Sequence, residues 1–221
     1  SEIIYTRGTT EGLNLLAETL TQSMKEGDEI LLTESEHHSN IVPWQIAATK
    51  RRLVVKVIPI DDNGELQTDK LESLITKRTK ILSLAQVSNS LGVVHPLDKI
   101  IPMARTIGGK DLKIIVDGAQ GIVHSKVDVK KLGCDFYCFS AHKLYAPMGI
   151  GIVYGREEIL STLPPYQGGG EMIESVDFDK TTFNVPPYKF EAGTPSVADV
   201  IGLGAALDFL NNLNMDEVFA H

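Results

Sequence analysis

Residues Phe136-Tyr137-Cys138-Phe139-Ser140-Ala141-His142-Lys143 form an apolar run that ends in small and polar groups. The run Ile114-Ile115-Val116-Asp117 has the same form earlier in the chain. Short apolar runs of this kind are typical of buried strands, and the polar residues behind them mark the strand ends. Both stretches therefore predict strands of one sheet that carry reactive side chains where they end.

Further apolar runs alternate with helical patterns along most of the chain, which indicates βα units. Strands are predicted at Glu2–Thr6, Glu29–Thr33, Leu53–Ile60, Lys80–Ala85, Lys113–Val116, Phe136–Ser140 and Gly151–Tyr154. Helices are predicted at Thr10–Met24, Asn40–Thr49, Thr68–Ile75, Leu97–Ile107 and Val197–Leu213. The segment Leu163–Pro195, rich in proline and glycine, is expected to be a long functional or subunit-contacting excursion. The predicted class is α/β, with a mostly parallel sheet and helices on both faces.

Composition narrows the possible functions. The 221 residues carry a net charge of −8 and a pI near 5.2, which argues against nucleic-acid binding, because phosphate backbones need clustered Lys and Arg. No apolar stretch reaches the roughly 18 to 20 residues of a membrane helix. Cys134 and Cys138, the only cysteines, are expected in the core of a protein from a reducing, cytoplasmic compartment. The chain begins without Met, and we expect both ends to continue in a longer protein.

In a sheet of this type, ligands bind beyond the carboxyl ends of the strands. Most lysines are solvated surface charges, but Lys143 ends a buried strand beside a histidine, which favours a depressed pKa and an amine nucleophile. Asp117 also emerges at a strand end. It is either a turn residue or, with a cofactor lysine nearby, a carboxylate that keeps a pyridine nitrogen protonated. Gln120 follows one short turn later and is placed to donate to a phenolic oxygen on the same ring.

The turn Gly8-Thr9-Thr10-Glu11-Gly12 opens the first predicted helix directly after a strand. A helix N-terminus offers free N–H groups and a positive dipole end, and the two threonines add hydroxyl donors, so the turn is a candidate phosphate seat. Ser140 and His142 are candidates for further phosphate contacts. The alternative is an ordinary helix start with nothing bound.

The adjacent His37 and His38 cannot both point the same way on an extended loop, so a two-histidine metal site is not expected. One of them is suited to stack flat on an aromatic cofactor, while the other faces solvent or a neighbour. The alternative is two loop histidines followed by a helix cap at Asn40. His95, His124 and His221 have no partners nearby in the sequence and are assigned structural roles, and no metal is expected.

Six motifs, in this order, resemble the class V aminotransferase family of fold type I, in particular its SUF-type cysteine desulfurase and selenocysteine lyase branch. They are Arg7-Gly8-Thr9-Thr10-Glu11-Gly12, Glu36-His37-His38-Ser39-Asn40-Ile41-Val42-Pro43-Trp44, Val87-Ser88-Asn89-Ser90-Leu91-Gly92, Val116-Asp117-Gly118-Ala119-Gln120, Phe139-Ser140-Ala141-His142-Lys143-Leu144-Tyr145 and Phe190-Glu191-Ala192-Gly193-Thr194-Pro195. One small departure is Ala141, where the family often has Gly; we expect the added methyl to be tolerated.

The resemblance implies pyridoxal phosphate as the cofactor and gives each site residue a role. Lys143 holds the cofactor and transfers the proton, and His37 stacks on the ring; these two are the catalytic candidates. Asp117 pairs with the pyridinium nitrogen and Gln120 with the phenolic oxygen. Asn89 contacts the bound amino acid.

The resemblance also implies how the phosphate is held and what lies outside the chain. The phosphate ligands are Thr9, Thr10, Ser140 and His142, and Thr194 reaches the phosphate of a neighbouring subunit, which implies a homodimer. Residues 1–221 would be the cofactor-binding large domain, without an N-terminal segment and a C-terminal small domain. The family's persulfide-forming cysteine and its substrate-carboxylate arginine lie in that later region.

The implied reaction is the conversion of L-cysteine to L-alanine, with the sulfur passed as a persulfide to a SUF-type acceptor for iron–sulfur cluster assembly. Three alternatives stay open: selenocysteine lyase, kynureninase-like or epimerase chemistry on the same cofactor; a non-enzymatic dinucleotide-binding or regulatory module; and a folded fragment without cofactor. The second is disfavoured because no G-x-G-x-x-G follows the first predicted strand.

Overall fold

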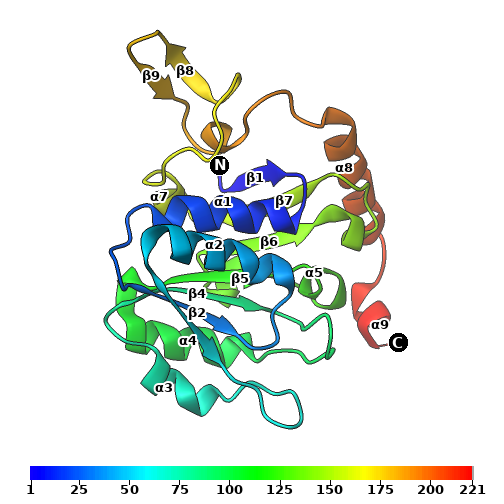
Figure 1. Ribbon diagram of the computed structural model, residues 1–221. Helices are drawn as coiled ribbons and strands as arrows, with labels where there is room; N and C mark the ends of the chain where they lie inside the picture. The colour runs from blue at the N-terminus through cyan, green and yellow to red at the C-terminus, as the bar shows by residue number, and fades with distance from the viewer. Residues whose placement is uncertain (221) are drawn as a thin grey trace.

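The computed structural model describes residues 1–220 (Figure 1), so the structural role predicted for His221 lies outside the described residues. A seven-stranded sheet in the order β1-β7-β6-β5-β4-β2-β3 forms the centre. Every predicted strand is confirmed, with ends shifted by two residues or fewer. The strands are β1 (Ile3–Thr6), β2 (Glu29–Thr33), β3 (Val54–Ile58), β4 (Thr79–Ala85), β5 (Lys113–Asp117), β6 (Phe136–Ser140) and β7 (Gly151–Gly155).

The sheet is mostly parallel, as predicted. β2 to β6 pair in parallel, and β7 runs antiparallel to both of its neighbours, β6 and β1. The register aligns the ends of three strands, because Ala85 lies opposite Asp117 and Asp117 lies opposite Cys138. The residues that follow these strands therefore emerge side by side at one edge.

The five predicted helices are also confirmed: α1 (Thr9–Thr21), α2 (Val42–Arg51), α3 (Leu71–Leu74), α4 (Leu97–Gly108) and α8 (Val197–Asn211). The helix predicted at Thr68–Ile75 starts with a 3₁₀ turn, Thr68–Lys70, before α3. Four short helices were not predicted, because one or two turns give no periodic pattern. These are α5 (Gly121–His124), α6 (Val129–Leu132), α7 (Glu157–Leu160) and α9 (Met215–Ala220).

The excursion predicted at Leu163–Pro195 contains a hairpin, β8 (Ile173–Val176) and β9 (Thr181–Phe183), which forms a separate two-stranded sheet. It projects away from the central sheet (Figure 1). Within residues 1–220, no helix combines the length and the apolar character needed to cross a membrane.

Alternate residues of each strand enter cores on opposite faces of the sheet. Ile30 and Leu32 of β2 belong to the cluster that contains Trp44 of α2, whereas Leu31 belongs to the cluster that contains Ile100 of α4. This period of two is that of a strand covered on both faces. The prediction of helices on both faces is therefore confirmed.

The two cysteines are buried core residues, as predicted, one in each cluster. Burial raises the pKa of the Cys134 thiol to about 12 and raises that of Cys138 well above its ordinary value. Both side chains are therefore neutral thiols at physiological pH, and neither is a thiolate nucleophile.

Candidate active site

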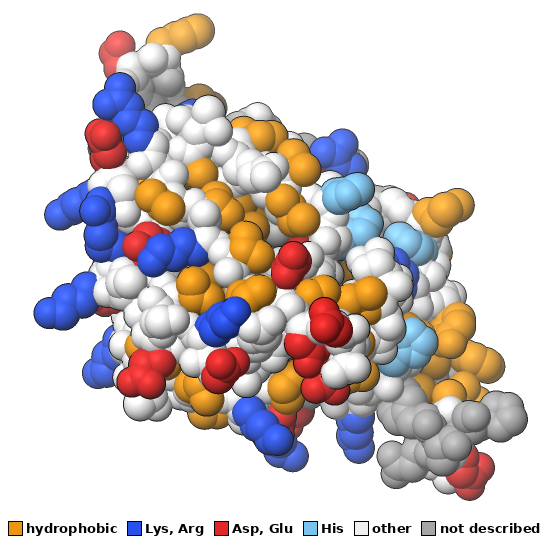
Figure 2. Space-filling model, turned by 60° about the horizontal axis from the view of Figure 1, so that its bottom comes forward, with side chains coloured by type: hydrophobic (Ala, Val, Ile, Leu, Met, Phe, Trp, Pro, Cys, Tyr) orange, Lys and Arg blue, Asp and Glu red, His pale blue; other side chains and the backbone are white. Residues whose placement is uncertain are grey.

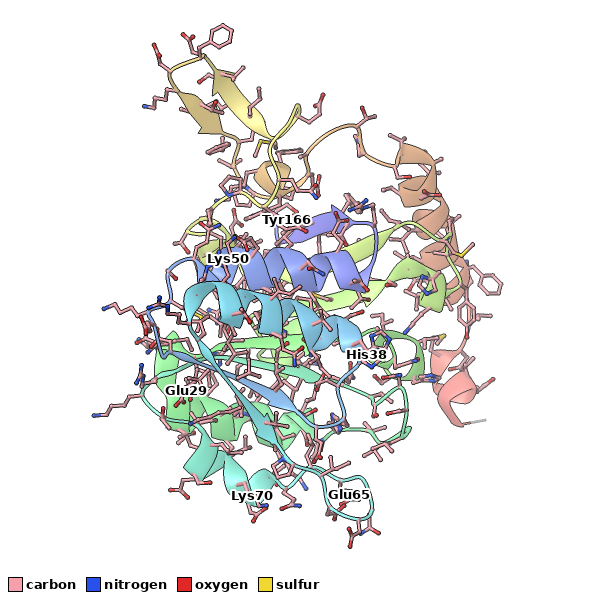
Figure 3. All side chains as sticks on the ribbon, viewed as in Figure 1. Glu29, His38, Lys50, Glu65, Lys70 and Tyr166 are labelled. Atoms are coloured by element: carbon pink, nitrogen blue, oxygen red, sulfur yellow. The ribbon has the colours of Figure 1, made fainter. Side chains whose placement is uncertain are left out.

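One cavity of about 240 Å³ at the carboxyl edge of the sheet gathers every predicted site residue except Thr194. Figure 3 marks this edge with His38, shortly before α2, and the opposite edge with Glu29 and Lys50. Thr194 lines a different cavity, of about 570 Å³, together with residues of β1 and α1. The first cavity is lined by Thr9, Thr10, His37, Ser39, Ala85, Val87, Asn89, Asp117, Ala119, Gln120, Ser140, His142 and Lys143.

Lys143 reaches the cavity from a 3₁₀ turn, Ala141–Leu144, that follows β6 directly. The turn is anchored by Ala141, which is fully buried and packs with Ile150 and Ile152. The N–H of Ala141 also donates to the carbonyl of Ile150 at 3.0 Å. The methyl group that distinguishes Ala141 from glycine is therefore accommodated in the core, as expected, and the turn holds Lys143 in a half-buried position.

Asp117 is the buried acid of the cavity, with 5% of its surface exposed. Its Oδ1 accepts from the N–H of Ala119 at 2.9 Å. Burial raises the pKa of this carboxyl, and the Ala119 N–H and the positive charges of Lys143 and His37 act in the opposite direction. A carboxylate in such a place is stabilised by a nearby cation, and a protonated ring nitrogen would be such a cation.

The start of α1 closes the cavity beside Ser140. The N–H of Thr9 donates to Ser140 Oγ at 2.8 Å, and the two side-chain oxygens also lie 2.8 Å apart. A close approach of β7 explains the glycine at position 151, because a Cβ there would lie 2.4 Å from the Cα of Gly8. Gly8 itself has φ +153°, a conformation that favours glycine. The N-terminus of α1 is thereby fixed against the sheet with its first turn at the cavity.

His37 lines the cavity and His38 does not, so the pair diverges as predicted. Nδ1 of His37 accepts from the N–H of Ser39 at 3.1 Å, so in the neutral ring Nε2 carries the proton. The alternative of a helix cap at Asn40 is wrong. α2 begins at Val42, and the fully buried Asn40 accepts from Trp44 Nε1 at 2.8 Å instead.

Ser39 is a site residue that the sequence did not predict. Its Oγ lies 2.7 Å from Thr10 Oγ1 and 3.0 Å from His37 Nδ1, so it links the candidate phosphate seat to the histidine predicted to stack on the cofactor. The only indication of this role in the sequence is a hydroxyl side chain two residues after His37. The remaining lining residues, Ala85, Val87 and Ala119, give the cavity an apolar wall.

The donor set of the cavity fits pyridoxal phosphate. Hydroxyls and a helix N-terminus suit a phosphate, a buried carboxylate suits a pyridinium nitrogen, and a lysine amine suits an aldehyde. Figure 2 shows histidine side chains gathered at one edge of the surface. Two histidines, His37 and His142, line the cavity. No single group here indicates the ligand, but the convergence of these groups on one small cavity matches the chemical groups of this cofactor.

The chain matches the aminotransferase class-V family over residues 1–221. It belongs to that family. The six motifs had implied this membership, and it makes pyridoxal phosphate the cofactor of a site of this kind. Which side chain contacts which part of the cofactor stays a prediction.

Several relatives and solved structures that the chain resembles are cysteine desulfurases. It is 49% identical to a cysteine desulfurase of Dickeya dadantii over the whole chain, which covers 53% of that protein. It is 44% identical, again over the whole chain, to one of Synechococcus elongatus, of which it covers 35%. The crystal structure of an Escherichia coli cysteine desulfurase superposes with a TM-score of 0.92 at 44% identity, over 96% of this chain and 53% of that one.

A more distant structure has a bound cofactor. A mutant of the protein C-DES with glycine covalently linked to its PLP cofactor superposes with a TM-score of 0.88 at 26% identity, over 99% of this chain and 58% of that one. This chain spans about half the length, or less, of the curated relatives described above.

Proposed function

We propose that the protein containing this chain is a pyridoxal-phosphate-dependent cysteine desulfurase, which converts L-cysteine to L-alanine and carries the sulfur away as a persulfide. The proposal rests on the single cavity in which Lys143, Asp117 and His37 meet. Relatives named cysteine desulfurase at 44% to 49% identity support the choice of substrate.

The cofactor, when bound, supplies an electron sink for the electrons that remain on the substrate when its α-proton is removed. Asp117 would keep the ring nitrogen protonated. Because its carboxyl is buried, the ionised carboxylate needs a cation beside it, and the protonated ring nitrogen would be that cation. His37 would cover one face of the ring and Gln120 would donate to its phenolic oxygen. Lys143 would hold the cofactor and then, as a free amine, take the α-proton from the substrate.

The phosphate would lie at the N-terminus of α1. Thr10 and His142 are exposed at this place, whereas the hydroxyls of Thr9 and Ser140 already contact each other. In this proposal Thr9 and Ser140 fix the helix start and also contribute to the phosphate site, and Asn89 contacts the amino acid. In this proposal the thiol that accepts sulfur would lie outside residues 1–221, which the burial of Cys134 and Cys138 supports.

The finer assignments belong to the same proposal: a homodimer, the SUF-type branch, a sulfur acceptor of iron–sulfur cluster assembly and a reducing, cytoplasmic compartment. The position of Thr194 supports the dimer. It is exposed and lines a cavity other than that of Lys143, so a phosphate contact from Thr194 would reach a second copy of the chain. Residues 1–221 would then be the cofactor-binding large domain of each subunit.

The reaction is tested on the full-length protein by product analysis. With pyridoxal phosphate, L-cysteine and a thiol reductant, we expect equal amounts of L-alanine and sulfide. Selenocysteine serves as the competing substrate. A much higher kcat/KM for selenocysteine would favour the lyase alternative, and pyruvate or D-cysteine as the product would contradict the desulfurase.

Replacing Ser39 with Ala is expected to weaken the binding of pyridoxal phosphate about threefold to tenfold, the loss of one or two hydrogen bonds of ordinary strength. The reason is the link from Ser39 Oγ to both Thr10 and His37. Affinity is measured by titrating the cofactor and following its visible absorbance. Ser73→Ala, at an exposed hydroxyl in α3, is the control and should bind like the wild type.

A further inference from the structure

A buried carboxyl behind the cavity has no part in the roles described above. Glu36, the residue before His37, is 8% exposed. Its Oε1 lies 2.5 Å from Thr33 Oγ1 and accepts from the N–H of Ala85 at 2.9 Å. Its Oε2 accepts from Asn40 Nδ2 at 2.7 Å. One side chain thus joins the end of β2, the loop that carries His37 and the last residue of β4.

Resting on the proposed function, we propose that Glu36 is a positioning residue for the loop that carries His37, and that its protonation closes a ring of hydrogen bonds which fixes the cavity wall at Ala85.

The ring continues through His95, a residue assigned only a structural role on sequence grounds. Thr33 Oγ1 lies 3.3 Å from Ser35 Oγ, and Ser35 Oγ lies 3.1 Å from His95 Nε2. His95 Nδ1 lies 2.8 Å from the carbonyl oxygen of Ala85. Ala85 is therefore held at both of its backbone groups, at the N–H by Glu36 and at the carbonyl by His95.

The ring of hydrogen bonds has a donor for every contact only when Glu36 is protonated. A protonated Glu36 donates to Thr33, Thr33 donates to Ser35, Ser35 donates to the neutral ring of His95, and His95 donates to the carbonyl of Ala85. With Glu36 ionised, the Thr33 hydroxyl turns to the carboxylate, and the contact between Thr33 and Ser35 has no hydrogen. The ring is therefore complete in one protonation state of Glu36.

The charges around Glu36 favour this state. Burial, helped by the negative charge of Asp117 on β5, raises the pKa of Glu36 to about 7 against the opposing effect of its hydrogen bonds with Thr33, Asn40 and Ala85. Burial also lowers the pKa of His95, which precedes α4, so its ring is neutral at pH 7. His37, on the same loop as Glu36, is the third titratable group close by.

The sign of the pH dependence follows from linkage. When the loop that carries Glu36 and His37 opens, the pKa of Glu36 returns to its ordinary value of 4.5. The proton on Glu36 is therefore bound more tightly in the closed loop than in the open one. The advantage of the closed state is fully present in acid, below the ordinary pKa, and is lost as the pH rises through about 7. For Glu36 taken alone, the opening constant should rise by about fortyfold between roughly pH 5 and pH 7. His95, whose pKa in the closed loop is lowered from its ordinary 6.5, acts in the opposite direction below that pH and makes the rise smaller.

Glu36→Gln has the same size but cannot complete the ring, because its single oxygen can replace only one of the two that accept from Ala85 and Asn40. Hydrogen exchange of the Ala85 amide, corrected for intrinsic rates, should be about tenfold faster than in the wild type at roughly pH 5. The rise in the opening constant from there to neutrality should disappear, which leaves only the opposite effect of His95. Thr33→Val breaks the ring elsewhere and should speed exchange while keeping a titration.

Glu34→Gln is the matched control, since Glu34 is exposed on the same loop and accepts from the N–H of Ile60 at 3.0 Å. It should leave Ala85 exchange unchanged at every pH. Wild-type exchange and pH dependence in Glu36→Gln would overturn the proposal. Cofactor titration of the same proteins judges the proposed function separately: if the wild type fails to bind pyridoxal phosphate, that function fails, while the exchange data still decide the role of Glu36.

Discussion

Replacing Lys143 with Ala is expected to lower the rate of alanine release from L-cysteine by about a thousandfold or more in the full-length protein. The amine of Lys143 lines the cavity that also contains Asp117, and no other lysine lines that cavity in the part of the chain that the structure describes. Its loss would remove both the holder of the cofactor and the proton acceptor. The measurement is the initial rate of alanine formation at saturating pyridoxal phosphate.

Lys110→Ala is the matched control, because Lys110 is exposed and precedes the opposite end of β5. It should keep the wild-type rate. Added methylamine should restore part of the activity of Lys143→Ala, since a small amine can stand in for the missing proton acceptor. If Lys143→Ala released alanine at a rate within about tenfold of the wild type, the assignment of Lys143 would be wrong.

Replacing Trp44 with Ala is expected to lower the free energy of unfolding by about 4 kcal/mol. The indole is fully buried between α2 and the sheet, in the cluster that includes Leu16 and Ile30. Truncation leaves a large cavity, and it also removes the bond from Nε1 to Asn40. Asn40 holds Glu36, so the loop of His37 should loosen as well.

Urea unfolding followed by circular dichroism measures this loss. Ile46→Ala on the same helix is the control, because Ile46 is 61% exposed and its truncation should cost less than about 0.5 kcal/mol. Trp44→Phe should fall between the two, since the ring fills most of the space but leaves Asn40 without its donor. Equal effects of Trp44→Ala and Ile46→Ala would contradict the packing described for this face.

Much of the fold could be predicted because the strands are short apolar runs with sharp polar ends. β2 and β6 were predicted to the residue for this reason. The short helices α5 and α6 could not be, since four residues show no periodicity. The hairpin of β8 and β9 lacks a buried face, so its sequence does not have the alternation of a core strand.

The convergence of the site could be predicted from sheet geometry, because parallel strands in register end at one edge. Asp117 and Lys143 follow strands predicted in the same sheet, and these strands, β5 and β6, are indeed neighbours. Ser39 and Glu36 were missed for a different reason. Their importance comes from hydrogen bonds inside a folded loop, and neither spacing nor polarity in the sequence indicates these partners.

Chemical trapping is the sharpest test of whether this cavity holds pyridoxal phosphate on Lys143. The full-length protein is incubated with the cofactor, reduced with borohydride, digested and mapped by mass spectrometry. We expect one pyridoxyl group, on the peptide that contains Lys143, and none on that peptide in Lys143→Ala. A pyridoxyl group on another lysine, or no stable modification of the wild type, would show that Lys143 does not hold the cofactor.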